Sequence, residues 1–152
     1  MSGLIARIAV CLLLGIGPAL ADGYLTPATI TPNSTRVLGQ LRGANFNVTT
    51  DQAIAINATA YQITSIIVTN CSTSMTLAAG GFYPAASKGG TPIVAATQVY
   101  SALTGSTITL NTTIAATPLI TRFTVSTIFL SLTTAQGAAA TCDVYVVGVD
   151  LS

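Results

Sequence analysis

The chain has 152 residues, of which 51% are hydrophobic and only 6% charged, and its formal net charge is +1 at neutral pH. This length allows one domain with a hydrophobic core. The charge lacks the basic excess that binding to nucleic acid or to an anionic membrane surface requires. The chain contains neither His nor Glu, which removes the commonest general bases, most catalytic zinc sites and every His-based triad. We therefore expect a protein that is not an enzyme, carries no cofactor and has no nucleic-acid partner.

The first 21 residues have the pattern of a secretory signal peptide. Arg7 precedes an apolar stretch over residues 8–20, and Ala19 and Ala21 place small residues at positions −3 and −1 before Asp22. A membrane anchor is the alternative, but this stretch is interrupted by glycines and a proline and is short for a span of about 20 residues. We expect cleavage after Ala21, a secreted or periplasmic protein, and no membrane association after cleavage. The mature chain then holds four basic and four acidic residues.

Export also changes the interpretation of the three cysteines. Cleavage removes Cys11 and leaves Cys71 and Cys142. Two cysteines in an oxidising compartment predict one disulfide, which stabilises the fold by about 4 kcal/mol on the chain-entropy description. The alternatives are a redox-active pair, which normally has C-x-x-C spacing, and a buried or mispaired thiol.

From residue 22 onward the sequence predicts an extended arm and then short strands. Residues 22–35 contain Pro27 and Pro32 without an apolar period, and we expect them to form the arm, with a single domain over 36–152. The predicted strands are residues 36–41, 52–57, 61–69, 75–83 with a bulge or a close backbone approach at Gly80-Gly81, 92–96, 106–113, 122–132 with a phase slip near Ser126-Thr127, and 142–149. Residues 85–91 form a turn, 97–103 a strand or a single helical turn, and 133–141 a loop.

The spacing of these strands predicts the fold class. They recur every 8–12 residues with turn residues between them, and no segment shows a convincing helical stripe. We expect an all-β protein built as an antiparallel β-sandwich, jelly-roll-like in its connections. In such a fold the Cys71–Cys142 bridge joins the end of the strand at 61–69 to the start of the last strand.

Few residues suggest chemistry. The aspartates Asp22, Asp51, Asp143 and Asp150 are scattered and form no calcium loop. A metal site assembled from distant aspartates and a two-carboxylate hydrolase both remain open as alternatives. Lys88 lies in a glycine-rich turn that lacks the context of a phosphate loop and is expected to be a hairpin tip. Five N-x-S/T sequons also occur, at Asn33, Asn47, Asn57, Asn70 and Asn111.

Tyr83 and Tyr100 are the aromatic residues with a predicted binding role. Both lie near glycine-rich or threonine-rich turns, where an exposed ring can stack on a ligand. Together with Lys88 they are the expected ligand contacts. The other aromatic residues are expected in the core or in a contact between subunits.

The scarcity of charge indicates self-association. A domain of this size normally has about 25% charged residues, and an almost uncharged surface is better tolerated when copies of the chain cover it. The runs 61–69 and 142–149 are apolar on both faces, as expected if one face meets the core and the other a neighbouring subunit. We therefore expect a homo-oligomer.

Several short stretches between residues 51 and 152 resemble small β-rich proteins of tailed-phage and prophage genomes. The stretches are Asp51–Ile54, Val68–Asn70, Ala78–Tyr83, Ala85–Thr91, Val99–Thr104, Leu130–Gly137 and Asp150–Ser152. The resemblance implies a virion-associated structural protein and carries no catalytic residue. The signal-like N-terminus and the cysteine pair are not expected of a particle assembled in the cytoplasm, and they favour an exported relative with the same fold.

Two functions follow from these observations. The first is an exported structural or assembly subunit, related to phage virion proteins, that acts by self-association and contacts cell-surface or virion components. The alternative is a secreted binding module, adhesin-like or lectin-like, that recognises a surface glycan or protein through the loops at 82–91 and 97–105.

Overall fold

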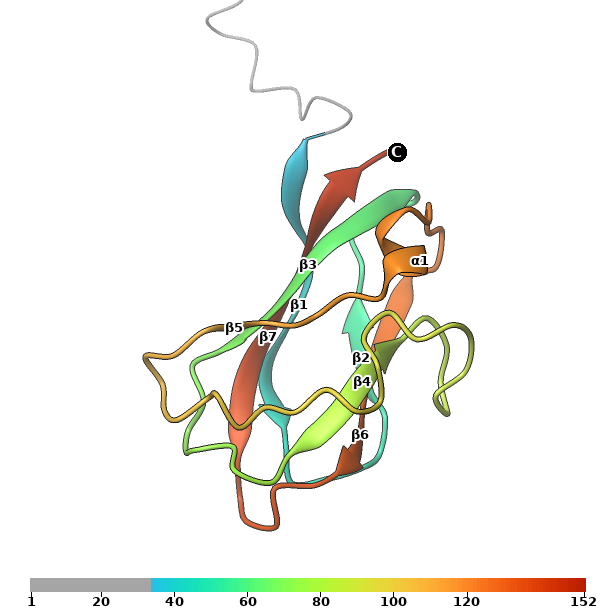
Figure 1. The fold of residues 1–152 in the computed structure, drawn as a ribbon. Coiled ribbons are helices and arrows are strands. Elements are labelled where there is room, and N and C mark those ends of the chain that lie inside the picture. The colour runs from blue at the N-terminus through green and yellow to red at the C-terminus, as the bar shows by residue number, and fades with distance from the viewer. Residues whose placement is uncertain (1–33) are drawn as a thin grey trace, which may run out of the picture. The chain divides into compact units, whose positions relative to one another are not determined.

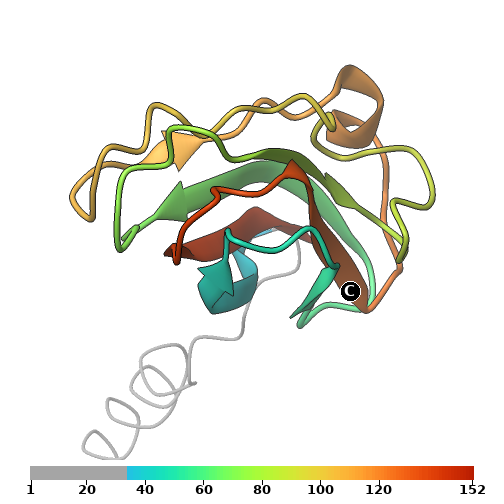
Figure 2. The ribbon, with the colours of Figure 1, turned by 90° about the horizontal axis from the view of Figure 1, so that it is seen from below.

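The computed structural model describes residues 34–152, so the predicted signal peptide (1–21) and most of the predicted arm (22–33) lie outside the described residues. The described part contains β1 (Thr35–Asn45), β2 (Gln52–Ala55), β3 (Tyr61–Thr69), β4 (Ala79–Tyr83), β5 (Leu110–Asn111), α1 (Ala116–Leu119), β6 (Thr127–Thr134) and β7 (Thr141–Asp150). One sheet has the order β1-β7-β3-β5 and the other β2-β6-β4 (Figures 1 and 2). All pairings are antiparallel. The prediction of an all-β antiparallel sandwich is confirmed.

The strands form because their apolar residues alternate with the pleat. In β7, Val144 and Val146 are fully buried, while Asp143, Tyr145 and Val147, which alternate with them, are only partly buried. In β6, Ile128, Leu130 and Leu132 are buried toward the core, and Ser131, which points to the opposite face, is buried as well. Because successive side chains of a strand point to opposite faces, each sheet places one apolar row between the two sheets, and these rows form the core.

Two glycines permit close contact between backbones. A Cβ atom at Gly148 in β7 would lie 2.0 Å from the carbonyl oxygen of Gln62 in β3, and one at Gly39 in β1 would lie 2.4 Å from that of Ala55 in β2. Real Cβ atoms do not approach oxygen so closely, so both sites require glycine.

Isolated bridges connect the two sheets at both sides. On one side Gly39 of β1 bridges Ile56, directly after β2, and the amide of Asn57 donates to the carbonyl of Leu38. On the other side Val94 bridges both Phe82 of β4 and Ile114, three residues after β5. The edge strands β1 and β2 are thus joined to each other, as are β4 and the segment that follows β5.

Four strand predictions need correction, since the predicted strand 92–96 contains only isolated bridges at Val94. Only Leu110 and Asn111 of the predicted strand 106–113 pair with β3, because the chain turns at residues 105–108 and then crosses to Val94. Residues 75–77 form a loop, since the amides of Leu77 and Ala78 donate to the side chain of Gln136 and not to a strand. Residues 97–103 form neither strand nor helix, although Val99 bridges Ala79.

The phase slip predicted near Ser126-Thr127 marks a change of partner strand. Phe123 exchanges both backbone hydrogen bonds with Tyr61 of β3, whereas β6 begins at Thr127 and pairs with β2 and β4. At Gly80-Gly81, where a bulge or a close backbone approach is expected, the register shifts between Ala79 and Gly80, and a Cβ atom at Gly81 would lie 2.3 Å from the carbonyl oxygen of Val94. The short helix α1 was not predicted.

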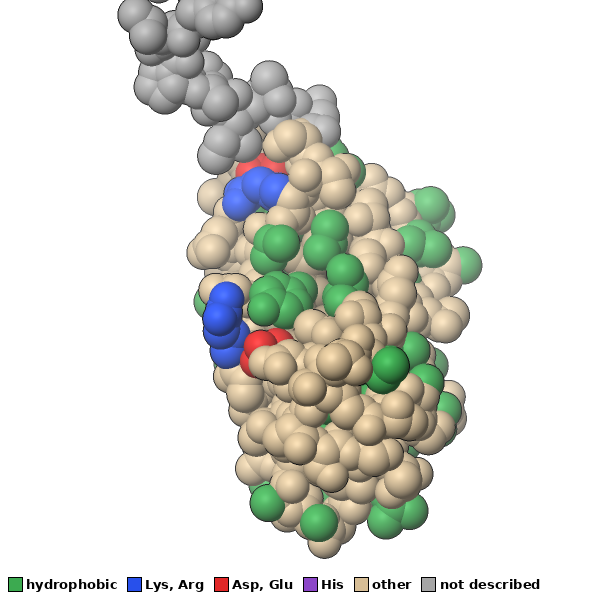
Figure 3. Space-filling view, turned by 90° about the vertical axis from the view of Figure 1, so that its left-hand side faces the viewer, with side chains coloured by type: hydrophobic (Ala, Val, Ile, Leu, Met, Phe, Trp, Pro, Cys, Tyr) green, Lys and Arg blue, Asp and Glu red, His purple; other side chains and the backbone are tan. Residues whose placement is uncertain are grey.

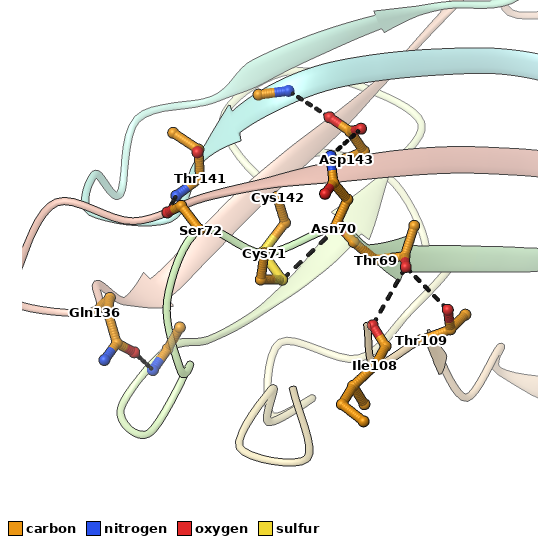
Figure 4. The surroundings of a disulfide bond; sticks show 12 residues. Thr69, Asn70, Cys71, Ser72, Ile108, Thr109, Gln136, Thr141, Cys142 and Asp143 are labelled. Atoms are coloured by element: carbon orange, nitrogen blue, oxygen red, sulfur yellow. Dashed lines mark hydrogen bonds between the residues drawn. A yellow bond between two sulfur atoms is a disulfide. The ribbon is translucent and has the colours of Figure 1, made fainter. Parts of the chain in front are cut away.

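The predicted disulfide is confirmed. Cys71 follows β3 and Cys142 is the second residue of β7, with Cα atoms 4.1 Å apart and a sequence separation of 71 (Figure 4). Both residues are buried. Beside them the backbone amide of Ser72 donates to the carbonyl of Thr141, and the backbone amide of Thr141 donates to the hydroxyl of Ser72. The disulfide therefore lies within a paired part of the sheet.

Candidate interaction surface

The outer face of the four-stranded sheet carries an apolar patch, which we name the outer patch. It consists of Val37 on β1, Ile67 on β3, and Tyr145, Val147 and Val149 on β7. Val37 is 48% exposed and the other four are partly buried. Figure 3 shows this face, with a group of hydrophobic side chains between two places where a basic and an acidic side chain lie close together. Outward-facing positions of an antiparallel sheet are ordinarily polar, so this composition needs an explanation.

The register arranges the outer patch in rows across the strands. Val37 pairs with Val147, Thr35 with Val149, and Gln40 with Tyr145. On the other side of β7, Ile67 of β3 also lies opposite Tyr145. Because directly paired residues of antiparallel strands have neighbouring side chains, the apolar groups form one continuous strip along β7.

A network of polar contacts holds one end of the outer patch. The carboxylate of Asp143 in β7 accepts hydrogen bonds from the side chain of Asn70, at 3.0 Å, and from the backbone amide of Gly43, at 2.8 Å (Figure 4). Asn70 lowers the pKa of Asp143, with smaller contributions from Gly43 and from the charge of Arg42. β1, β3 and β7 are thereby fixed to one another beside the disulfide.

The other end is held by an ion pair between Arg36 of β1 and Asp150 of β7. Nε of Arg36 donates to Oδ2 of Asp150 at 2.9 Å, and the guanidinium also donates to the carbonyl of Asn57. The pKa of Asp150 falls to about 2, chiefly because Ser152 donates from its hydroxyl and its backbone amide, and secondly because of Arg36. Both ends of the strand pair β1-β7 are thus anchored by a carboxylate.

Two of the three predicted ligand contacts lie inside the protein. Tyr100 is fully buried, packs edge-on against Phe46 with ring centroids 5.0 Å apart, and donates its hydroxyl to the carbonyl of Gly80. Tyr83 is 4% exposed. The expectation that these rings are exposed for stacking is wrong, because the fold buries both of them, Tyr100 against the distant Phe46. Lys88 is exposed at a turn, as predicted.

The aspartates of the described residues are far apart in the fold. Asp51 precedes β2, whereas Asp143 and Asp150 lie at opposite ends of β7. The pKa of Asp51 is lowered first by the hydrogen bond from the backbone amide of Ser87, then by the neighbouring Ser131 hydroxyl and Lys88. Within residues 34–152 no group of three or more potential metal-ligating side chains occurs, and no helix is long and apolar enough to cross a membrane.

No protein family, curated protein or solved structure matches the chain. The outer patch therefore has to be interpreted from its own geometry. Sequence reasoning anticipated it in part, since it read 61–69 and 142–149 as apolar on both faces. It missed Val37, because that residue belongs to a weakly alternating run whose pairing with β7 only the fold reveals.

Proposed function

We propose that the protein is an exported structural subunit whose copies associate through the outer patch. The observation that supports this most strongly is the row of exposed and partly buried apolar side chains along β1 and β7. An apolar sheet face rimmed by polar residues is typical of a surface that another protein covers. The occupant we assign to it is a second copy of the chain.

The outer patch is complementary to a second copy of itself, because residues paired across β1 and β7 can exchange partners between two copies. A two-fold axis that runs between two such faces, along the strands and midway between β1 and β7, sets each Val37 opposite Val147 of the second copy. The same axis sets each Arg42 opposite Asp143 of the second copy. Apolar groups then meet apolar groups, and opposite charges meet at the rim. Two sheets packed with aligned strands are an established mode of association.

The connections between strands support a jelly roll. Successive strands alternate between the two sheets, and the segment around Val94 takes the place of an eighth strand beside β4. Jelly rolls of eight strands occur in viral capsid proteins and in lectins. This agrees with the resemblance to phage virion proteins, and we extend the proposal to a subunit of phage-related descent that contacts virion or cell-surface components.

The disulfide is compatible with an extracellular or periplasmic location. Together with the pattern of residues 1–21, it supports export followed by cleavage after Ala21.

The test is size-exclusion chromatography with light scattering on the oxidised, exported protein. Mass spectrometry of the intact protein gives the mass of its chain. We expect a dimer or larger closed species, and a mass that corresponds to residues 22–152. Val147→Lys should convert it to a monomer, because a charge in the middle of the contact must be desolvated without a partner. The matched control is Val99→Lys, since Val99 is a 58% exposed valine outside the outer patch.

Two results would contradict the proposal. One is a wild-type monomer at about 100 µM, a concentration that detects any contact stronger than about −5.5 kcal/mol. The other is an oligomer that survives Val147→Lys, which would place the contact elsewhere. Circular dichroism of both variants shows whether the fold is retained.

A further inference from the structure

A polar hollow lies on the opposite side of the sandwich from the outer patch. It has a volume of about 390 Å³ and is lined by Thr49, Thr50, Asp51, Ser87, Lys88 and Ser131. The hollow is shallow and widely open to solvent. Since Gln52 pairs with Leu130, the residue before it, Asp51, comes beside Ser131 on the outer face of the three-stranded sheet. The strand pairing thus sets a carboxylate next to a hydroxyl in the hollow.

Ser131 is the buried polar residue of this hollow, and its hydroxyl lies close enough to Asp51 to lower the pKa of that carboxyl. It is 1% exposed, and among the described residues its Oγ is the buried side-chain polar atom without a hydrogen-bond partner. Leaving a buried hydroxyl unpaired costs free energy, and such groups in native proteins call for a reason. A ligand that brings its own hydroxyl group would supply the missing partner.

The turn that forms one wall of the hollow is held in a strained conformation. Ser87 and Lys88 have φ angles of 56° and 60°. This left-handed region of backbone conformation is rarely adopted by residues other than Gly, Asn and Asp. The backbone amide of Ser87 donates to the carboxylate of Asp51, which keeps the turn over the hollow. Strain of this kind is often found at ligand-binding segments.

We infer that the hollow binds a neutral saccharide. Asp51 and Lys88 contribute opposite charges, so the hollow carries no net charge that would select an ionic ligand. The other four lining side chains are hydroxyls, each of which both donates and accepts hydrogen bonds. Adjacent hydroxyls of a sugar ring can donate to Asp51, accept from Lys88 and pair with Ser131. The inference is independent of the proposed self-association, because it uses another face of the molecule.

The experiment is a titration followed by ¹⁵N–¹H correlation NMR on the Val147→Lys variant, or on the wild type if that is monomeric. The probes are the methyl glycosides of glucose, galactose, mannose and N-acetylglucosamine, each at millimolar concentration. We expect saturable shifts at the amides of Asp51, Ser87 and Lys88 with at least one glycoside. Asp51→Asn and Lys88→Met should each weaken this binding at least tenfold, whereas the matched controls Asp143→Asn and Arg122→Ala should leave it unchanged.

Ser131→Ala separates a role in binding from a role in folding. Because the hydroxyl is unpaired in the free protein, we expect this variant to unfold at the same or a higher urea concentration, while its affinity for the glycoside falls about tenfold. The inference is overturned if no glycoside shifts these amides, or if the shifts persist in Asp51→Asn. It is also overturned if glycine, a small zwitterion that matches the two charges alone, binds and the glycosides do not.

Discussion

Gly148 sets the distance between the two central strands of the larger sheet. A Cβ at this position would meet the carbonyl oxygen of Gln62 at 2.0 Å and the side chain of Leu38 at 2.7 Å. The carbonyl belongs to the backbone of β3, which cannot move without breaking its pairing with β7. The absence of a side chain here is therefore a requirement of the fold.

We predict that Gly148→Ala lowers the free energy of unfolding by about 2–3 kcal/mol, as overpacking at a well-packed site does. Urea unfolding measures it. The matched control is Gly105→Ala, since nothing lies within 4 Å of a Cβ there and no positive φ is required. Equal stability of the two variants would show that β3 and β7 can separate without loss.

At the scale of the element, β3 and β7 are linked at one end by the disulfide and by the hydrogen bond from Asn70 to Asp143. The disulfide closes a long loop, because its cysteines have a sequence separation of 71. Restricting so long a loop reduces the entropy of the unfolded chain considerably. The paired strands themselves are held by backbone hydrogen bonds along their length.

We predict that replacing both cysteines, in Cys71→Ala/Cys142→Ala, lowers the free energy of unfolding by about 4 kcal/mol. The wild type should lose a similar amount when a reductant is added, and the double variant should not respond to the reductant. Urea unfolding with and without reductant gives both values. A wild type whose unfolding midpoint is insensitive to reductant would contradict this expectation.

An element could be predicted accurately where local residues define it, and less accurately where distant contacts do. The strands at 61–69 and 142–149 could be predicted accurately because continuous β-branched residues define them locally. The segment at 106–113 alternates just as clearly, yet only two of its residues pair, because the crossing to Val94 is determined by distant contacts. The exposure of Tyr100 was wrongly predicted for a similar reason, since the residues that bury its ring, such as Phe46, are remote in sequence. The orphan hydroxyl of Ser131 gives no signal in the sequence at all.

At the scale of the whole molecule, the few charges are used to fix the ends of strands. The pKa values of Asp51, Asp143 and Asp150 are all lowered, in each case chiefly by hydrogen bonds donated to the carboxylate. A carboxyl group whose pKa is lower in the folded than in the unfolded state stabilises the fold above its ordinary pKa, near 4. That stabilisation is lost as the pH falls through the folded-state pKa, which for Asp150 is about 2.

We predict that stability is constant from neutral pH down to about pH 4 and then falls steadily toward pH 2. Asp150→Asn should be less stable than the wild type at neutral pH and should show a shallower acid decline, because it lacks the group with the largest shift. Urea midpoints across this pH range test it, with Arg122→Ala as a charge-changing control that keeps the wild-type profile. An acid decline of the same steepness in Asp150→Asn would contradict the assignment.

The bridges at Gly39 and Val94 have a consequence for the size of any assembly. An open sheet edge invites another strand to pair with it, and repeated addition of this kind leads to fibres without a defined end. Here β1 is already joined to Ile56, and β4 and the segment after β5 to Val94. Growth by strand addition is therefore disfavoured at these positions, and the proposed contact uses side chains on a sheet face instead. A contact with two-fold symmetry closes on itself, so the proposed assembly should have a fixed number of subunits even at high concentration.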